Sequence, residues 1–162
     1  MRHYAAALLL LAALATAAEA RDSLGVFDAW GAFRDPQVPR CYAIAQPDEV
    51  RGTQQYRPFA SIGYWPRRGV RGQFHLRLSR AMAKGQAVTL TIGIRRFRLT
   101  GGGGDAWARD KTMDASIIAA MRSAREMSAT SEDARGNTIR DLYLLKGAAT
   151  AMDAAALGCA RR

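Results

Sequence analysis

The arginines between Tyr64 and Arg98 are the side chains of this chain whose type and spacing could do chemistry. Two aromatic residues and three arginines stand together in the segment Tyr-Trp-Pro-Arg-Arg-Gly-Val-Arg, which begins at Tyr64. A guanidinium group binds phosphate or carboxylate through paired hydrogen bonds, and aromatic rings stack on cations. Together with the arginines of the next strands, the segment predicts a surface that binds an anionic ligand through Tyr64, Trp65, Arg67, Arg68, Arg71, Arg77, Arg95, Arg96 and Arg98.

The basic residues are concentrated in the middle of the chain. Between Val50 and Gly104 there are eleven lysines and arginines and no acid, within a chain whose net charge is +10. Such a stretch attracts anions unless acids elsewhere in the fold pair with it. Two simpler explanations stay open: a solvated basic face that the ends of the chain partly neutralise, and the arginine- and alanine-rich composition that a GC-rich genome produces.

The other polar residues predict no metal site, no nucleotide site and no cofactor. His75 alternates with Phe74 and Leu76, which indicates a surface or edge histidine. It is the only histidine expected to remain after export, which is too few for a histidine-based metal cluster. The spacing of Asp105, Asp110 and Asp114 is unlike that of a calcium loop, and Asp114 is expected to cap a helix. The glycine run at 101–104 lacks the Gly-Lys-Ser/Thr junction of a phosphate loop.

A second class of function stays open at this point. A small hydrolase or lyase could use carboxylates such as Asp105 and Asp110 as acid and base. It would need a cleft that raises the pKa of one of them. No pattern in the sequence indicates such a cleft.

Alternating apolar residues predict two central strands, over 73–80 and 88–94. The apolar positions then change parity at Phe97 and Leu99, so a bulge or tight turn is expected at Arg95-Arg96. Glu126 to Leu145 is typical of a hairpin with its turn near 133–137. Further expected elements are a strand that ends in a loop over 21–40, strands over 41–45 and 56–65, a loop at 101–104, and helices over 114–124 and 147–157, the last ended by Gly158.

These elements predict a mainly β fold: an antiparallel β-sandwich or partly open barrel with two short helices, one of them near the C-terminus. We expect a single domain over residues 21–162. No later stretch is apolar enough to suggest a transmembrane segment in the mature chain.

The first twenty residues have the layout of a secretory signal. A short basic start is followed by an apolar run over 5–18, and Ala18-Glu19-Ala20 offers the small residues that a signal peptidase recognises. We expect cleavage after Ala20 and a periplasmic or secreted protein. Exactly two cysteines, Cys41 and Cys159, are present, and an even count in an exported protein predicts a disulfide between them.

The second half of the chain resembles the invasion-associated locus B family of bacterial exported proteins. The matching segments are Ala87–Ile94, Phe97 with Leu99, Asp114–Met121, Arg122–Ser128 and Asp141–Met152, while the first half matches only in Trp30 before Cys41. The family often has a close cysteine pair where this chain has 101–107, and usually an aromatic residue where it has Ala148. The resemblance implies a β-rich envelope protein, linked in some bacteria to host-cell entry, and it supplies no catalytic residues.

The expected function is that of an exported, non-enzymatic envelope protein. Its basic, aromatic-flanked surface is expected to bind an anionic component of the envelope or of a host surface. No nucleic-acid partner is expected, because an exported protein rarely meets one. An adhesion or invasion factor that contacts a host cell is a further alternative.

Overall fold

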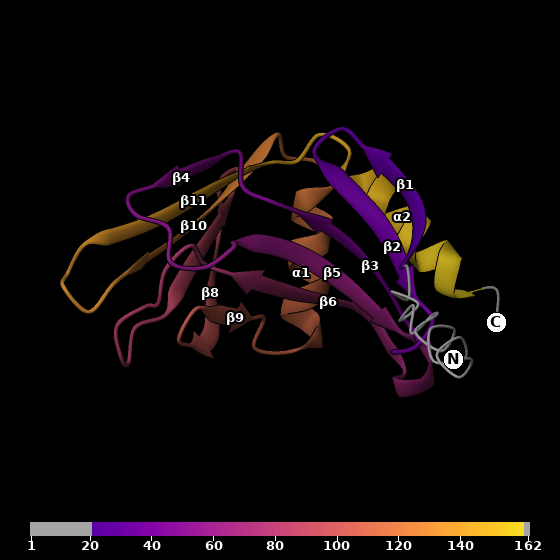
Figure 1. The fold of residues 1–162 in the computed structure, drawn as a ribbon, viewed down its shortest axis with the longest axis horizontal. Helices are drawn as coiled ribbons and strands as arrows, with labels where there is room; N and C mark the ends of the chain where they lie inside the picture. The colour runs from indigo at the N-terminus through magenta and orange to yellow at the C-terminus, as the bar shows by residue number, and fades with distance from the viewer. Residues whose placement is uncertain (1–20, 161–162) are drawn as a thin grey trace, which may run out of the picture.

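The computed structural model describes residues 21–160, so the expected signal segment at 1–20 lies outside the described residues. One antiparallel sheet has the strand order β1-β2-β3-β5-β6-β9-β8-β7-β10-β11-β4. It does not close, because β1 and β4 form its two edges (Figure 1). The elements are β1 (Asp22–Phe27), β2 (Trp30–Asp35), β3 (Arg40–Ala45), β4 (Glu49–Arg51), β5 (Phe59–Trp65), the short 3-10 helix η1 (Pro66–Arg68), β6 (Val70–Arg77), β7 (Val88–Ile92), β8 (Arg95–Gly102), β9 (Asp105–Trp107), α1 (Lys111–Met121), β10 (Glu126–Glu132), β11 (Thr138–Leu144) and α2 (Ala148–Ala160).

The sheet bends at β8, which divides it into two limbs. The first part of β8 pairs with β7, whereas residues 100–102 pair with β9. Helix α1 lies inside this bend, in contact with β6 on one limb and with β7 and β8 on the other. Helix α2 packs on β1, β2, β3 and β5. The prediction of a mainly β, antiparallel and partly open fold with two helices, one near the C-terminus, is confirmed.

The core lies between the sheet and the two helices. Ile62 and Phe74 point from the sheet toward α1, and Leu90 and Met127 line the same core from the second limb. Trp30 is fully buried, and its indole N–H donates to the carbonyl oxygen of Leu144 at 2.9 Å. That bond joins β2 to the end of β11, which lie far apart along the sheet.

The predicted disulfide is present between Cys41 on β3 and Cys159 on α2, with a Cα–Cα distance of 5.8 Å. Gly158 does not end the helix, contrary to expectation. A Cβ there would lie 2.5 Å from the side chain of Leu24, so this glycine lets α2 approach β1 closely. The helix continues for two more residues, which carries Cys159 to Cys41.

Several predicted boundaries were wrong for local reasons. The tight turn falls at Gly93-Ile94, where Gly93 has φ +57°, and it brings Ile92 opposite Arg95. This two-residue turn accounts for the change in apolar parity. The segment 21–40 is a hairpin of β1 and β2 whose turn begins at Asp28, with φ 50°. The glycines at 101 and 102 are paired strand residues, not loop.

Helix α1 begins three residues earlier than predicted. Asp110, in extended conformation, caps it by accepting the N–H of Met113 at 2.8 Å. Asp114 is instead buried inside the first turn and accepts the N–H of Phe74 from β6. The predicted hairpin of β10 and β11 is confirmed, and so is the predicted strand at 41–45, which begins one residue earlier at Arg40. No helix among residues 21–160 is both long and apolar enough to cross a membrane.

Candidate functional site

The connection between β5 and β6 presents Arg67 and Arg68 on a well-defined turn, and Arg71 follows as the second residue of β6. Pro66 begins the 3-10 helix η1, and Gly69 ends it in left-handed conformation with its N–H bonded to the Pro66 carbonyl at 3.1 Å. Arg67, Arg68 and Arg71 are exposed, and none lies within 4.0 Å of a carboxylate oxygen of residues 21–160. We call these three residues the basic turn. Three guanidinium groups without an internal counter-ion can take up an anion from solution.

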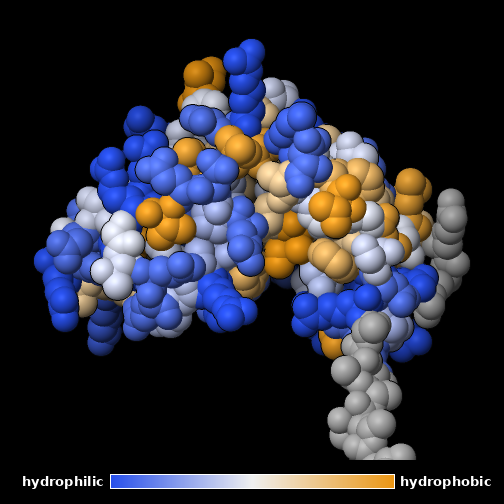
Figure 2. Space-filling model, turned by 45° about the horizontal axis from the view of Figure 1, so that its top comes forward, coloured by the Kyte–Doolittle hydropathy of each residue, from blue (hydrophilic) through white to orange (hydrophobic). Residues whose placement is uncertain are grey.

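The basic turn lies beside the disulfide. A hollow of about 240 Å³ is lined by Arg34, Arg40, Arg67 and the backbone around Cys159. Arg34 is paired with Asp22, and Arg40 lies 3.6 Å from Asp35, so these two arginines are partly neutralised while Arg67 is not. Hydrophilic side chains gather at this lower right end of the molecule in Figure 2.

Arg34 and Arg40 belong to this end of the molecule, and sequence reasoning missed both. Both lie in the part of the sequence before Val50, where acidic and basic residues are mixed, so neither belongs to the stretch of single-sign charge. The signal that could have found Arg40 is its place beside Cys41, because the disulfide gathers its neighbours around the C-terminal helix.

Tyr64 and Trp65 lie on opposite faces of the sheet, so they do not join the arginines on the one surface that the sequence predicted. Tyr64 pairs with Arg71 and lines a second hollow of about 430 Å³ with Ala156 and Cys159, on the face covered by helices. Burial there raises the pKa of the Tyr64 hydroxyl, an effect that nearby Arg122 opposes. Trp65 points to the other face of the sheet, because consecutive residues of a strand alternate.

The nine predicted site residues therefore do not form one surface. Arg95, Arg96 and Arg98 lie on β8, in the other half of the molecule from the β5–β6 turn (Figure 1). Arg95 donates to the Ser116 carbonyl at 3.3 Å and its guanidinium lies 5.0 Å from the centre of the Phe97 ring. The linear stretch of like charge is split because its strands run in opposite directions on two limbs of a bent sheet.

Arg77 is also separated from the basic turn, because it lies at the other end of β6, and its guanidinium is already bound. It makes two hydrogen bonds to Asp105, at 3.0 and 2.6 Å. Asp105 also bonds Nε2 of His75 at 2.9 Å. Although burial opposes the effect, the bonds from Arg77 and His75 hold the pKa of Asp105 below its ordinary value.

His75 is half-buried in a central strand rather than at an edge, since β6 pairs with both β5 and β9. Its ring stacks on that of Trp107, with centroids 4.8 Å apart and planes 2° from parallel, and meets the Phe59 ring edge-on at 5.1 Å. Within residues 21–160, no serine, threonine or cysteine side chain bonds its imidazole. The His75–Asp105 pair therefore lacks a nucleophile partner.

The aspartates show no acid and base pair. The N–H of Met113 and the Arg109 side chain hold the pKa of Asp110 below its ordinary value, as the neighbours of Asp105 do for that residue. Burial raises the pKa of Asp114, against the N–H that Phe74 donates, but this carboxyl lies under β6 as a structural acceptor. No group of three or more His, Cys, Asp or Glu side chains in the described range could hold a metal ion.

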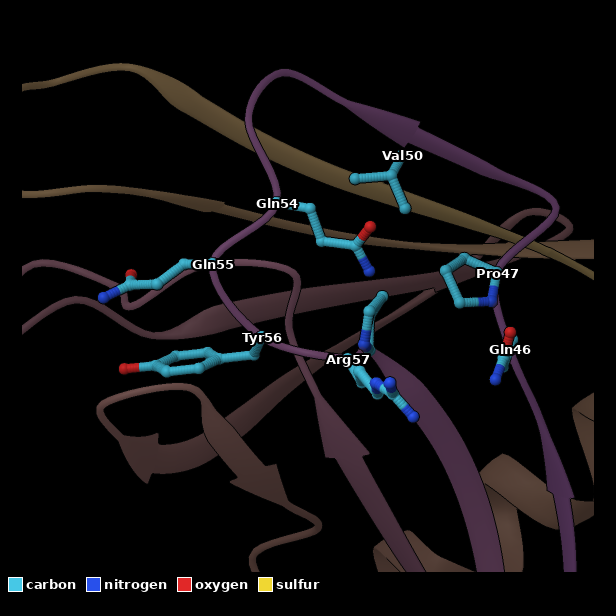
Figure 3. Close-up of a pocket in the computed structure, with 8 residues that line it drawn as sticks. Gln46, Pro47, Val50, Gln54, Gln55, Tyr56 and Arg57 are labelled. Atoms are coloured by element: carbon cyan, nitrogen blue, oxygen red, sulfur yellow. The ribbon is translucent and has the colours of Figure 1, made fainter.

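A further hollow, of about 560 Å³, is an open depression beside the loop that leads into β5 (Figure 3). Gln54, Arg57 and Pro47 approach one another across it, and Tyr56 lies at its side. It contains none of the predicted site residues. Its wall of amides and one arginine offers hydrogen bonds but no paired catalytic groups.

Comparison of the chain with protein-family models, with curated proteins and with solved structures finds no match.

Proposed function

We propose that this chain is an exported, non-enzymatic envelope protein that binds an anionic component of the envelope or of a host surface through the basic turn. The observation that carries the proposal is the exposure of Arg67 and Arg68 on the turn and of Arg71 at the start of β6, without a carboxylate partner among residues 21–160. An exposed cluster of like charge raises the local concentration of anions, and guanidinium groups bind their oxygens in pairs.

The disulfide supports the proposed export and the proposed site together. Disulfides persist in oxidising compartments such as the bacterial periplasm or the extracellular space. This one fixes α2 beside the basic turn. A fixed turn loses little conformational entropy when it binds, which favours a binding role.

The wider proposal is that the protein belongs with the envelope proteins of the invasion-associated locus B family, which its second half resembles. A role in host-cell contact follows only if the basic turn is displayed outside the cell. Fractionation of cells that make the protein, followed by protease treatment of intact cells, distinguishes a surface protein from a periplasmic one. Degradation in intact cells is the result expected of an adhesion or invasion factor.

The test of the basic turn is binding to inorganic polyphosphate at increasing salt. Replacement of Arg67, Arg68 and Arg71 together with Ser should abolish binding that the wild type shows at low salt. Binding by the wild type should weaken as salt rises, because exposed charges are screened within about 8 Å at physiological ionic strength.

The matched control is the triple replacement of Arg125, Arg135 and Arg140 with Ser. These arginines are exposed, lie far from the basic turn in the sequence, and make no ion pair among residues 21–160. The control loses the same net charge, so it should retain binding. Equal loss in both triple variants would show that only net charge matters, and unchanged binding by the Arg67, Arg68 and Arg71 variant would remove the proposal.

A further inference from the structure

One face of the sheet is covered by neither of the two helices within residues 21–160. Ile62 and Phe74 point toward the helices, so their strand neighbours point the other way. In Figure 1 strands β5 and β6 pass in front of α1, and the open face is turned to the viewer. Six ring side chains lie on this open face, which we call the aromatic face: Phe33, Tyr42, Phe59, Trp65, His75 and Trp107.

Two of these rings lie flat along their own strands because a glycine stands beneath each. A Cβ on Gly63 would lie 2.3 Å from the Trp65 ring, and a Cβ on Gly31 would lie 2.7 Å from the Phe33 ring. Neither glycine has positive φ, so the backbone does not require glycine there. The rings occupy the space of the missing side chains, and a flat ring presents its π-face to whatever lies above the sheet.

Polar groups stand among the rings. Ser61 and Gln73 lie on the same face, in the rows of His75 and Tyr42 respectively. The paired side chains of Arg77 and Asp105 border it at one side, beyond Phe59. A surface that alternates rings with hydrogen-bonding groups suits a ligand that is itself amphipathic. A pyranose sugar has this property, with an apolar C–H face and a hydroxyl edge.

The aromatic face continues into the basic turn. Trp65 directly precedes η1, and the Arg40 guanidinium lies 4.9 Å above the centre of the Tyr42 ring while lining the same hollow as Arg67. The face itself is neutral, because Arg77 and Arg40 each have an aspartate partner. Unpaired positive charge is therefore at its end. A ligand that matches both parts is a chain of sugar rings that carries negative charge.

We propose that the aromatic face binds an acidic polysaccharide, with pyranose rings stacked on Trp65 and Trp107 and a carboxylate or other anionic substituent bound at the basic turn. The inference rests on the proposed function, since it names the chemical class of the anion that the basic turn takes. A protein partner fits less well, because apart from Ile44 the face offers few aliphatic side chains to bury.

The tryptophans make the proposal directly observable. The chain has three, of which Trp30 is fully buried and Trp65 and Trp107 lie on the aromatic face. Titration with polygalacturonate, a carboxylated pyranose chain, should change the intrinsic fluorescence of the wild type. Trp65→Ala and Trp107→Ala should each weaken binding about fivefold, because one stacked ring contributes roughly 1 kcal/mol. Leu157→Ser, on the exposed side of α2, should leave binding unchanged.

Gly63→Ala tests the flat ring without removing it. The new Cβ displaces the Trp65 ring from the strand, so binding of polygalacturonate should weaken while the ring is still present. Thermal melts of each variant establish that it is folded. If Trp65→Ala does not fold, Trp107→Ala still decides the matter, because Trp107 is 37% exposed and ends a short strand.

Two further probes separate this inference from the proposed function. Polyphosphate is an anion without sugar rings, and hydroxyethylcellulose is a pyranose chain without charge. We expect the tightest binding to polygalacturonate. The tryptophan variants should weaken binding of the two polysaccharides and leave binding of polyphosphate unchanged. If the tryptophan variants bind polygalacturonate as the wild type does, the inference fails and the anion site survives. If hydroxyethylcellulose binds as tightly as polygalacturonate, the acidic ligand is wrong. If sedimentation shows that the wild type is a dimer and that Trp65→Ala is a monomer, the aromatic face binds a second copy of this chain instead.

Discussion

Removal of the disulfide should cost a large part of the stability of this fold. Cys41 and Cys159 are separated by 118 residues, so the bond closes a loop that spans nearly all of the described chain. In the chain-entropy model the loss is about 2.1 plus 1.5R ln n cal/mol/K, which for this loop corresponds to about 4.9 kcal/mol at 25 °C. We therefore expect the variant Cys41→Ala/Cys159→Ala to retain only marginal stability.

Urea unfolding followed by tryptophan fluorescence measures this effect. With a slope of roughly 2 kcal/mol/M, the midpoint of the double variant should fall by about 2.5 M. Addition of a reductant should lower the midpoint of the wild type to that of the double variant, and should not affect the double variant itself. A fall of less than about 1 kcal/mol would refute the reasoning, because the cross-link would then not restrict the unfolded chain.

Three further predictions concern local features. Gly101→Ala should destabilise the fold by about 2 kcal/mol or more, since its Cβ would lie 2.0 Å from the Asp105 carbonyl oxygen, whereas Gly102→Ala, with open space around it, should change the urea midpoint little. Asp110→Ala should lower the urea midpoint through loss of the α1 cap, and Asp110→Asn should restore most of the loss in the same assay. Burial raises the pKa of Asp141, so its contribution to stability is fully present below the unfolded pKa and is lost as the pH rises through the folded pKa. In thermal melts from pH 7 to pH 4, the wild type should therefore gain stability on acidification, and Asp141→Asn should remove this gain. Identical pH profiles of the variant and the wild type would contradict the prediction.

The gain in stability that Asp141 gives on acidification does not continue to low pH. The neighbours of Asp105, Asp133 and Asp153 lower the pKa of these carboxyls, and their contributions are present above the unfolded value and are lost as the pH falls through the folded value. Below about pH 4 the gain from Asp141 is complete, and only the loss from these three carboxyls continues. The stability maximum should therefore lie in mild acid for the wild type.

Short-range patterns were enough to predict most strands and the closing hairpin. The alternation of Phe74 with His75 and Leu76 follows from which face of β6 is buried, and that signal is local. The change in the alternation of apolar residues before Phe97 also indicated a real turn, but the prediction placed that turn two residues too late in the sequence. The reason is that a glycine with φ +57° at 93 makes a two-residue turn that parity alone does not locate.

The candidate site depended on information that is not local. A run of one sign of charge says nothing about which strands come to lie together, so Arg95 and Arg67 were grouped although the bend at β8 separates them. The pairing of Arg77 with Asp105 was equally hidden, because β9 joins β6 across 28 positions of the chain.

The sequence by itself determined the sulfur pairing, the mainly β class and the presence of an arginine-rich turn, because two cysteines allow one intramolecular bond and because periodicity and composition are properties of the linear chain. Only the tertiary structure decided which arginines have no carboxylate partner among residues 21–160, and that six rings share a face that neither α1 nor α2 covers. Those properties depend on contacts between strands distant in the sequence, and such contacts are set by how the sheet bends and where the helices pack.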